Sequence, residues 1–321
     1  MPLSKNGPRN SAGSGGIFEG AGKSMASANA LRYWVAAARP KTLPLAITPV
    51  FAGVTLAVAQ TGEVAWLTAL LTLLVAVSIQ IGTNMHNDAG DFERGTDTPE
   101  RVGPPRATAE GWLTAGAVKR AANAIFLTGF IIGVILAFRG GWPIFWLGVI
   151  SIACGYIYTR GPRPIAYGPY GELFVLIFFG IAAVAGTHYL QTLVLGWVPI
   201  ILGVAIGLPA AAVLLVNNYR DLTTDRQAGR RTLAHYLGER GSRLVYTGML
   251  GLTFVLLWTL PLPGAHWSLL LALPLALWLV YRLYRGAAGA ALNTVLAQTA
   301  GLQMLVAILL AVGYAWPAGG S

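Results

Sequence analysis

The chain has 321 residues, of which 55% are hydrophobic and only 11% are charged, and its formal net charge is +10 at pH 7. Its apolar runs are too long for soluble domains, and the only cysteine, Cys154, excludes an intrachain disulfide and a cysteine-rich metal site. The basic residues lie in several segments beside these runs, which favours lipid headgroups or a bound phosphate over nucleic acid as partners.

The chain begins with a polar tail. Residues 1–28 are rich in Gly, Ser, Ala and Asn without hydrophobic periodicity, so we expect a disordered tail followed by one membrane domain at 29–321. The segment from Leu31 to Thr42 then mixes aromatic and basic residues, as is typical of a membrane interface. Lys41 in this segment is either a surface anchor or a ligand for a phosphate.

Nine apolar runs follow, each near the ~20 residues that a helix needs to cross a bilayer. The runs lack the alternation of barrel strands, so we expect an all-α polytopic membrane protein with nine transmembrane helices. The runs are centred on residues 42–60, 64–86, 115–138, 142–159, 168–188, 192–216, 244–262, 267–284 and 293–315.

The positive charges predict the orientation of these helices. Of the 22 Lys and Arg residues, all except Arg139 fall on one side of the nine expected spans. This asymmetry places the N-terminus and the basic connections in the cytoplasm and the C-terminus outside, as expected for a multi-pass protein of a bacterial (inner) cell membrane. The two longest connections, roughly 87–114 and 217–243, share the cytoplasmic side, so we expect function to face the cytoplasm.

Two acidic clusters follow the second and sixth apolar runs. Acidic residues at a membrane boundary are costly and need a functional reason. At helical spacing Asn84 and Asp88 share a face, and the same holds for the members of the second cluster. The candidate ligands are Asn84, Asp88, Asp91 and Asp97 in the first cluster and Asn217, Asp221 and Asp225 in the second.

Crowded carboxylates repel one another unless a cation lies between them. Mg²⁺ prefers hard oxygen ligands and commonly combines one or two carboxylates with substrate phosphate oxygens. The pattern therefore predicts Mg²⁺ holding a phosphorylated substrate, whereas zinc is disfavoured because no His or Cys cluster accompanies the acids. The plainer alternative is that the acids only pair with arginines in solvated loops.

The strings Asn87-Asp88-Ala-Gly-Asp91 and Asp221-Leu-Thr-Thr-Asp225 resemble the two aspartate-rich motifs of the UbiA superfamily of intramembrane aromatic prenyltransferases. The stretches 39–44, 95–104, 164–174 and 217–233 look like the branch of that superfamily that acts on 1,4-dihydroxy-2-naphthoate. The resemblance runs from about residue 31 to the last helix. Arg230 replaces the lysine expected in that branch, which keeps the charge but changes the geometry of phosphate contact.

The resemblance implies nine helices around a central cavity open to the cytoplasmic side, and a Mg²⁺-dependent transfer of a polyprenyl group from its diphosphate to an aromatic acid. Asp88, Asp91, Asp221 and Asp225 would then be catalytic. The candidate diphosphate ligands are Lys41, Arg101, Arg106, Arg220 and Arg230. Tyr158, Tyr167 and Glu172 are candidates for contact with the aromatic substrate, although both tyrosines also suit an interfacial belt.

Two rival functions stay open. A neighbouring branch would use another phenolic acceptor, such as 4-hydroxybenzoate or homogentisate. A cation-coupled transporter would use the same acids as an ion site, but it would need acids near the bilayer midplane and a path to both sides. Nearly all the acids of this chain lie at one boundary, which favours the prenyltransferase.

Overall fold

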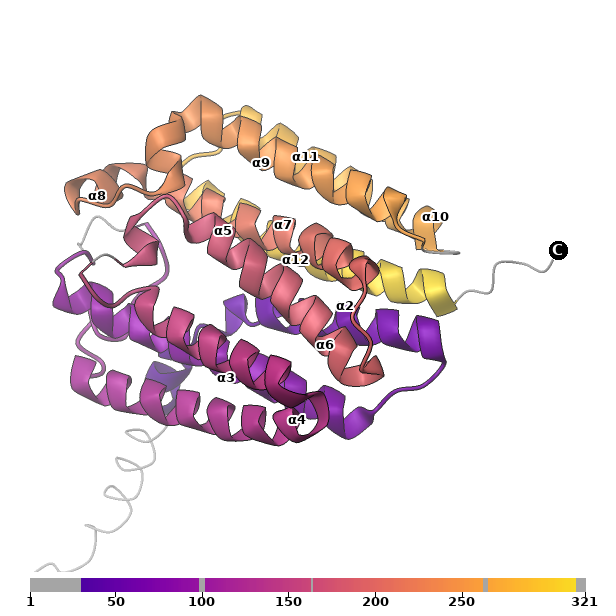
Figure 1. The fold of residues 1–321 in the computed structure, drawn as a ribbon. Coiled ribbons are helices and arrows are strands. Elements are labelled where there is room, and N and C mark those ends of the chain that lie inside the picture. The colour runs from indigo at the N-terminus through magenta and orange to yellow at the C-terminus, as the bar shows by residue number, and fades with distance from the viewer. Residues whose placement is uncertain (1–29, 98–101, 163, 262–264, 316–321) are drawn as a thin grey trace, which may run out of the picture.

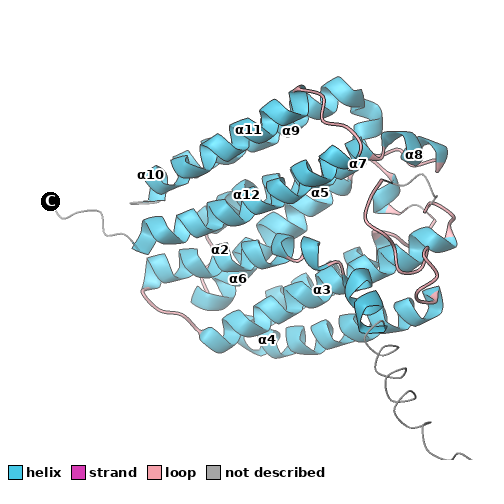
Figure 2. Ribbon diagram, turned by 180° about the vertical axis from the view of Figure 1, so that it is seen from behind, coloured by secondary structure: helices cyan, strands magenta, loops and turns pink. Residues whose placement is uncertain are grey.

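The computed structural model describes residues 30–97, 102–162, 164–261 and 265–315. The predicted tail at 1–28 lies outside these residues. Within the described residues every regular element is helical, and the long helices run side by side in one bundle (Figures 1 and 2). The expectation of an all-α membrane protein is confirmed.

The long helices correspond to the apolar runs of the sequence. They are α2 (Pro44–Thr61), α3 (Trp66–Glu93), α4 (Ala115–Ile157), α7 (Trp197–Arg220), α9 (Leu233–Thr259) and α12 (Ala290–Ala315). Two further spans are assembled from shorter pieces. One joins α5 (Gly171–Leu176), a π-helical turn at Ile177–Ala182 and α6 (Ala183–Thr192), and the other joins α10 (Ala265–Leu269) to α11 (Leu273–Tyr284).

Helix α4 is a hairpin of two spans. Its 43 residues would extend about 65 Å if straight, roughly twice the thickness of a bilayer core. Gly141 breaks it with φ 69° and ψ −163°, a conformation that favours glycine. The rings of Phe126 and Tyr156, which would lie about 45 Å apart on a straight helix, have centroids 5.1 Å apart.

Eight helices in the described part of the chain are long and apolar enough to cross a membrane, with α4 counted once. Because α4 doubles back at Gly141, these eight helices supply nine crossings. The break falls between the runs expected at 115–138 and 142–159. The nine expected spans are therefore all present as helical segments.

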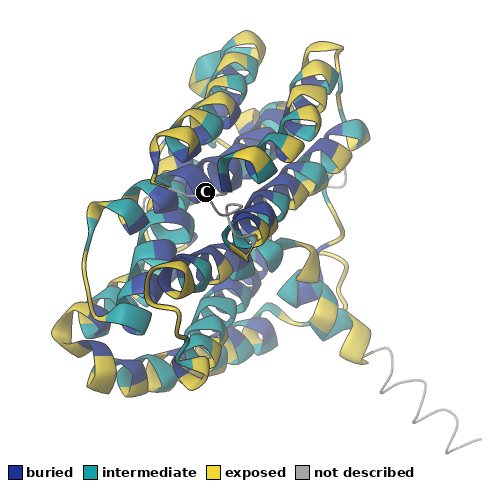
Figure 3. Cartoon of the chain, turned by 90° about the vertical axis from the view of Figure 1, so that its right-hand side faces the viewer, coloured by how far each residue is buried: buried dark blue, intermediate teal, exposed yellow. Residues whose placement is uncertain are grey.

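The outer faces of the bundle expose large apolar side chains, which a soluble protein would bury. Large apolar side chains such as Phe138 and Trp66 are 88% and 76% exposed, as suits contact with lipid. Buried positions gather in the interior (Figure 3). Helix α7 is the most enclosed span, with 72% of its apolar window buried against 11% for α3.

Glycines bring the span formed by α5 and α6, which is the fifth of the nine crossings, directly against α7. A Cβ atom on Gly180 would lie 2.4 Å from the Gly203 carbonyl oxygen and 2.7 Å from the Gly207 Cα atom. Small residues permit this close backbone approach between membrane helices. The contact fixes α5 beside the end of α7, where the second acidic cluster begins.

Candidate active site

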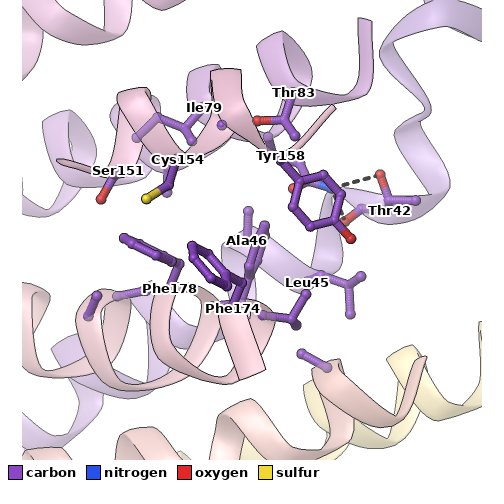
Figure 4. A pocket seen from close by; sticks show the side chains of 18 of the residues that line it. Thr42, Leu45, Ala46, Ile79, Thr83, Ser151, Cys154, Tyr158, Phe174 and Phe178 are labelled. Atoms are coloured by element: carbon purple, nitrogen blue, oxygen red, sulfur yellow. Dashed lines mark hydrogen bonds between the residues drawn. The ribbon is translucent and has the colours of Figure 1, made fainter. Parts of the chain in front are cut away.

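A cavity of about 350 Å³ lies between α2, α3, α4, the fifth span and α7. Its lining on α3 runs from Thr72 to Asp91, which is about 28 Å along the helix. Apolar side chains form most of the wall, and Phe174 and Phe178 face Ile79 and Cys154 across it (Figure 4). The charged residues of the wall are Arg39, Asp91, Arg106 and Arg230.

Asp91 is the acidic residue of the first cluster that faces this cavity. It lies in the last turn of α3 and is 4% exposed. Arg106 donates to its Oδ2 atom at 2.7 Å, and Arg230 donates to its Oδ1 atom at 2.5 Å. Tyr167 adds a hydrogen bond to Oδ1 at 3.0 Å. Two arginines and a phenol thus share one buried carboxylate.

Arg230 joins the two acidic clusters. Its Nη1 atom lies 3.5 Å from Oδ1 of Asp225, while its Nη2 atom contacts Asp91, which is 139 residues away in the chain. Asp225 is in the short helix α8 (Leu222–Gln227), where burial raises the pKa of its carboxyl to about 6 against the opposing effect of Arg230. One arginine therefore forms ion pairs with an aspartate of each cluster.

The rest of the second cluster is organised by Arg220, whose side chain is 1% exposed. Its Nε and Nη2 atoms donate to the two oxygens of Asp221 at 2.7 and 2.6 Å. Nη2 also contacts Oδ1 of Asn217 at 2.9 Å, and Nη1 contacts Asn293 at 2.5 Å. Asn217 lines the cavity, whereas Arg220 and Asp221 lie behind it.

Asp88 and Asn84 contact neighbouring segments of the protein. Both oxygens of Asp88, which is 1% exposed, accept backbone N–H groups, from Ala107 at 3.1 Å and Thr108 at 3.0 Å. The amide of Asn84 reaches the cavity wall but donates to the Ala38 carbonyl at 3.0 Å and to Thr42 at 2.9 Å. The structure thus gives each of them a fold-maintaining partner.

The remaining predicted charges are distributed unevenly. Asp97 lies 3.2 Å from Arg106 and is beside the cavity through that pair. Lys41 is exposed in the turn Pro40–Thr42 and is not part of the cavity wall. Arg101 lies outside the described residues. Of the five predicted cations, the structure places Arg106 and Arg230 in the wall.

The three candidates for aromatic contact occupy different positions. Tyr158 lines the cavity near Thr42 (Figure 4). Tyr167 is not part of the wall, and two guanidinium groups lie over its ring, with the Cζ atom of Arg230 at 4.3 Å and that of Arg94 at 5.0 Å from the ring centroid. Glu172 is 3% exposed and accepts a hydrogen bond from Asn218 at 2.9 Å.

Arg39, Asn87 and Asn218 are among the polar residues of the wall that sequence reasoning missed. Asn87 precedes Asp91 by four residues, the same spacing as Asn217 and Asp221, so the signal was present in the sequence. Arg39 belongs to the same interfacial segment as Lys41. It adopts left-handed φ and ψ values of 54° and 66°, an uncommon conformation for a side-chain-bearing residue.

The oxygen atoms at the site are suitable ligands for Mg²⁺, but the described side chains alone do not complete the coordination shell of the ion. Among the described residues no three His, Cys, Asp or Glu side chains are grouped closely enough to hold a metal. Asn87 Oδ1 is buried at the cavity wall without a hydrogen-bond partner in the described part of the chain. An orphaned amide oxygen beside Asp91 suits Mg²⁺, which takes few protein ligands and completes its shell with phosphate oxygens and water.

Comparison with known proteins places this site in a family. A model of the UbiA prenyltransferase family matches residues 46–297. The chain is 42% identical to the 1,4-dihydroxy-2-naphthoate octaprenyltransferase of Mycobacterium tuberculosis, over 87% of this chain and 95% of that protein. It is 39% identical to the Escherichia coli protein of the same name, over 75% of this chain and 82% of the relative.

A solved structure shares the fold. The UbiA homolog from Archaeoglobus fulgidus bound to DMAPP and Mg²⁺ superposes with a TM-score of 0.64 over 88% of this chain and 98% of that one, at 16% identity.

Proposed function

The chain belongs to the UbiA prenyltransferase family, and we propose that it transfers a polyprenyl group from polyprenyl diphosphate to 1,4-dihydroxy-2-naphthoate. Diphosphate and CO₂ leave, and the product is demethylmenaquinol, an intermediate of menaquinone biosynthesis. The single observation that supports this most is Arg230, which joins both acidic motifs at the polar wall of a long apolar cavity. The relatives from M. tuberculosis and E. coli support the choice of acceptor.

Arg106 and Arg230 would bind the diphosphate of the donor. Both line the cavity and already lie within hydrogen-bond distance of Asp91. Guanidinium groups match phosphate oxygens in a bidentate geometry and keep their charge at any working pH. Arg39 is a further cation of the wall. Lys41, Arg101 and Arg220 stay predictions, and the last of these would act through Asn217 and Asp221.

Asn87, Asp91, Asn217, Asp221 and Asp225 are the residues that would hold Mg²⁺. Mg²⁺ supplies charge neutralisation of the diphosphate, which favours its departure as an anion. Asn84, Asp88 and Asp97 were predicted with this set, and we propose that they act by supporting it. Asp88 anchors the backbone at residues 107–108, next to Arg106, and Asp97 pairs with Arg106 itself.

The apolar part of the cavity would hold the isoprenoid tail and exclude water. Departure of the diphosphate leaves an allylic carbocation, which water would trap before the aromatic ring attacks it. Phe174 and Phe178 stack on one wall with their ring centroids 5.9 Å apart. Aromatic faces stabilise a nearby cation without acting as nucleophiles.

The chain is a multi-pass membrane protein, and we propose that it lies in the inner membrane of a bacterial cell. Nine crossings put the two ends of the bundle's chain on opposite sides of the membrane. The basic connections share the side of the acidic clusters, so we propose a cytoplasmic N-terminus, an external C-terminus and a cavity that opens toward the cytoplasm.

Turnover by the purified protein tests this proposal. The protein in detergent, with Mg²⁺ and a labelled polyprenyl diphosphate, should prenylate 1,4-dihydroxy-2-naphthoate in preference to 4-hydroxybenzoate and homogentisate, and it should release CO₂. A preference for another phenolic acid would replace the acceptor but keep the reaction class. Absence of turnover with every acceptor, together with cation uptake by proteoliposomes, would favour a transporter instead.

A further inference from the structure

Glu172 and Asn218 form a buried polar pair beside the cavity. Glu172 lies in the first turn of α5 and is 3% exposed, and Asn218 lies near the end of α7 and is 9% exposed. The amide Nδ2 of Asn218 donates to Oε1 of Glu172 at 2.9 Å. A carboxyl group at this depth is expensive to bury, so its retention here needs a reason.

An ion pair with arginine does not explain the burial of the Glu172 carboxyl. Within the described residues no ion pair of Glu172 is found, and its Oε2 atom is buried without a hydrogen-bond partner. Consecutive residues on a helix point about 100° apart. Asn217 accordingly contacts Arg220 of the acidic cluster, while Asn218 turns to Glu172. The pair is therefore separate from the network that joins Asp91 and Asp225.

Glu172 determines which way the Asn218 amide points. A carboxyl oxygen accepts the Asn218 N–H₂ group, so the Asn218 carbonyl oxygen is the atom left for another partner. Asn218 is part of the cavity wall. The Asn218 oxygen is then the polar atom of this side chain that remains for a ligand in the cavity, and a ligand that carries an O–H group could donate to it.

The position of Asn218 suits the aromatic acceptor rather than the diphosphate. A carbonyl oxygen repels phosphate oxygens but accepts a phenolic O–H group. Asn217 and Asn218 both line the cavity, so a ring held at Asn218 lies near the diphosphate end, where the allylic carbon must meet its nucleophile. Tyr158 is on the same part of the wall, since its hydroxyl would lie 3.6 Å from a Cβ atom on Gly171, the neighbour of Glu172.

We propose that Asn218 selects the aromatic substrate by accepting a hydrogen bond from one of its ring hydroxyls, and that Glu172 is the positioning residue that fixes the Asn218 amide for this purpose. This inference rests on the proposed function. It adds to that function a specificity-determining residue and a requirement for a free ring hydroxyl at one position of the acceptor.

The test compares 1,4-dihydroxy-2-naphthoate with its two monomethyl ethers, which lack one hydroxyl donor each. The wild-type protein should discriminate against one ether in kcat/KM. Asn218→Leu removes the acceptor at similar volume, and it should raise the KM for the naphthoate and reduce that discrimination by about tenfold, as expected for one buried hydrogen bond. The KM for polyprenyl diphosphate should stay within about twofold.

Glu172 variants separate positioning from mere stability. Glu172→Gln keeps an oxygen that can accept the Asn218 amide and should retain the discrimination. Glu172→Ala frees the amide to rotate and should lose most of it. Gln303→Leu is the matched control, because Gln303 is also a buried amide, donates to the Ile206 carbonyl at 3.0 Å and lies outside the cavity wall. It should leave both KM values unchanged.

The outcomes are distinguishable. Wild-type protein that prenylates no aromatic acid would sink the proposed function. Active wild-type protein whose Asn218→Leu variant discriminates between the ethers as before would overturn this inference alone. If Asn218→Leu does not yield folded protein, equal discrimination by Glu172→Ala and Glu172→Gln would overturn it.

Discussion

Arg230 offers the most direct test of the site, because a single side chain joins both acidic motifs. Its Nη2 atom contacts Asp91 at 2.5 Å and Thr96 at 3.1 Å, its Nη1 atom lies 3.5 Å from Asp225, and its guanidinium stacks on Tyr167. Arg230→Ala removes all of these contacts. Arg230→Lys keeps one charge but cannot reach both carboxylates with a planar fork.

The expected losses differ between the two variants. A hydrogen bond to a charged group contributes about 1.5–3 kcal/mol. Loss of both carboxylate contacts, partly replaced by water, should therefore cost roughly 3 kcal/mol, or about 100-fold in kcat/KM for polyprenyl diphosphate. The lysine variant should keep one contact and lose about tenfold. Steady-state kinetics at saturating acceptor measures both values.

Arg226→Ala is the matched control, because Arg226 is exposed on the neighbouring helix α8 and has no ion pair within the described part of the chain. It should keep nearly full activity. Equal losses in Arg230→Ala and Arg230→Lys would refute a role for the charge. An Arg230→Ala variant with more than half of the wild-type kcat/KM would refute the proposed link between the motifs.

Three further predictions follow from the cavity and its surroundings. Asp88→Asn should lower the free energy of unfolding in detergent by about 1–3 kcal/mol, because it weakens the bonds to Ala107 and Thr108. Asp221 pairs with Arg220, and Asp221→Asn should abolish turnover with a smaller loss of stability. Gly148→Trp should reduce kcat/KM for a long donor about tenfold more than for a short one, because the new side chain would fill part of the cavity. Gly148 lines the cavity, and a Cβ atom there meets nothing within 4 Å. An unchanged ratio of kcat/KM between the two donors, or the same change in Gly248→Trp outside the wall, would contradict this. Chelation with EDTA should stop turnover and added Mg²⁺ should restore it, whereas persistent activity in EDTA would exclude the metal.

The sequence determined the fold class because a bilayer leaves few solutions. Runs of about 20 apolar residues must form helices whose backbone groups are satisfied internally. The separate runs at 115–138 and 142–159 even located the turn at Gly141 that makes α4 a hairpin. The acidic motifs were also visible, since carboxylates at the ends of apolar helices are costly and stand out.

Which side chain of each motif meets the cavity was decided by tertiary structure. Asn84 and Asp88 share a helical face, and in the structure both side chains bond to neighbouring segments, at Ala38 and at Thr108. Asn84, Asn87 and Asp91 nevertheless line the cavity, whereas Asp88 does not.

The sequence by itself therefore specified a nine-span helical membrane protein with paired acidic motifs on one side. The three-dimensional packing alone decided that Arg230 joins Asp91 to Asp225, that Arg39 rather than Lys41 lines the cavity, and that Glu172 bonds to Asn218. The physical reason is that helical periodicity gives the faces of each helix, but only contacts between distant segments select the face that surrounds the substrate.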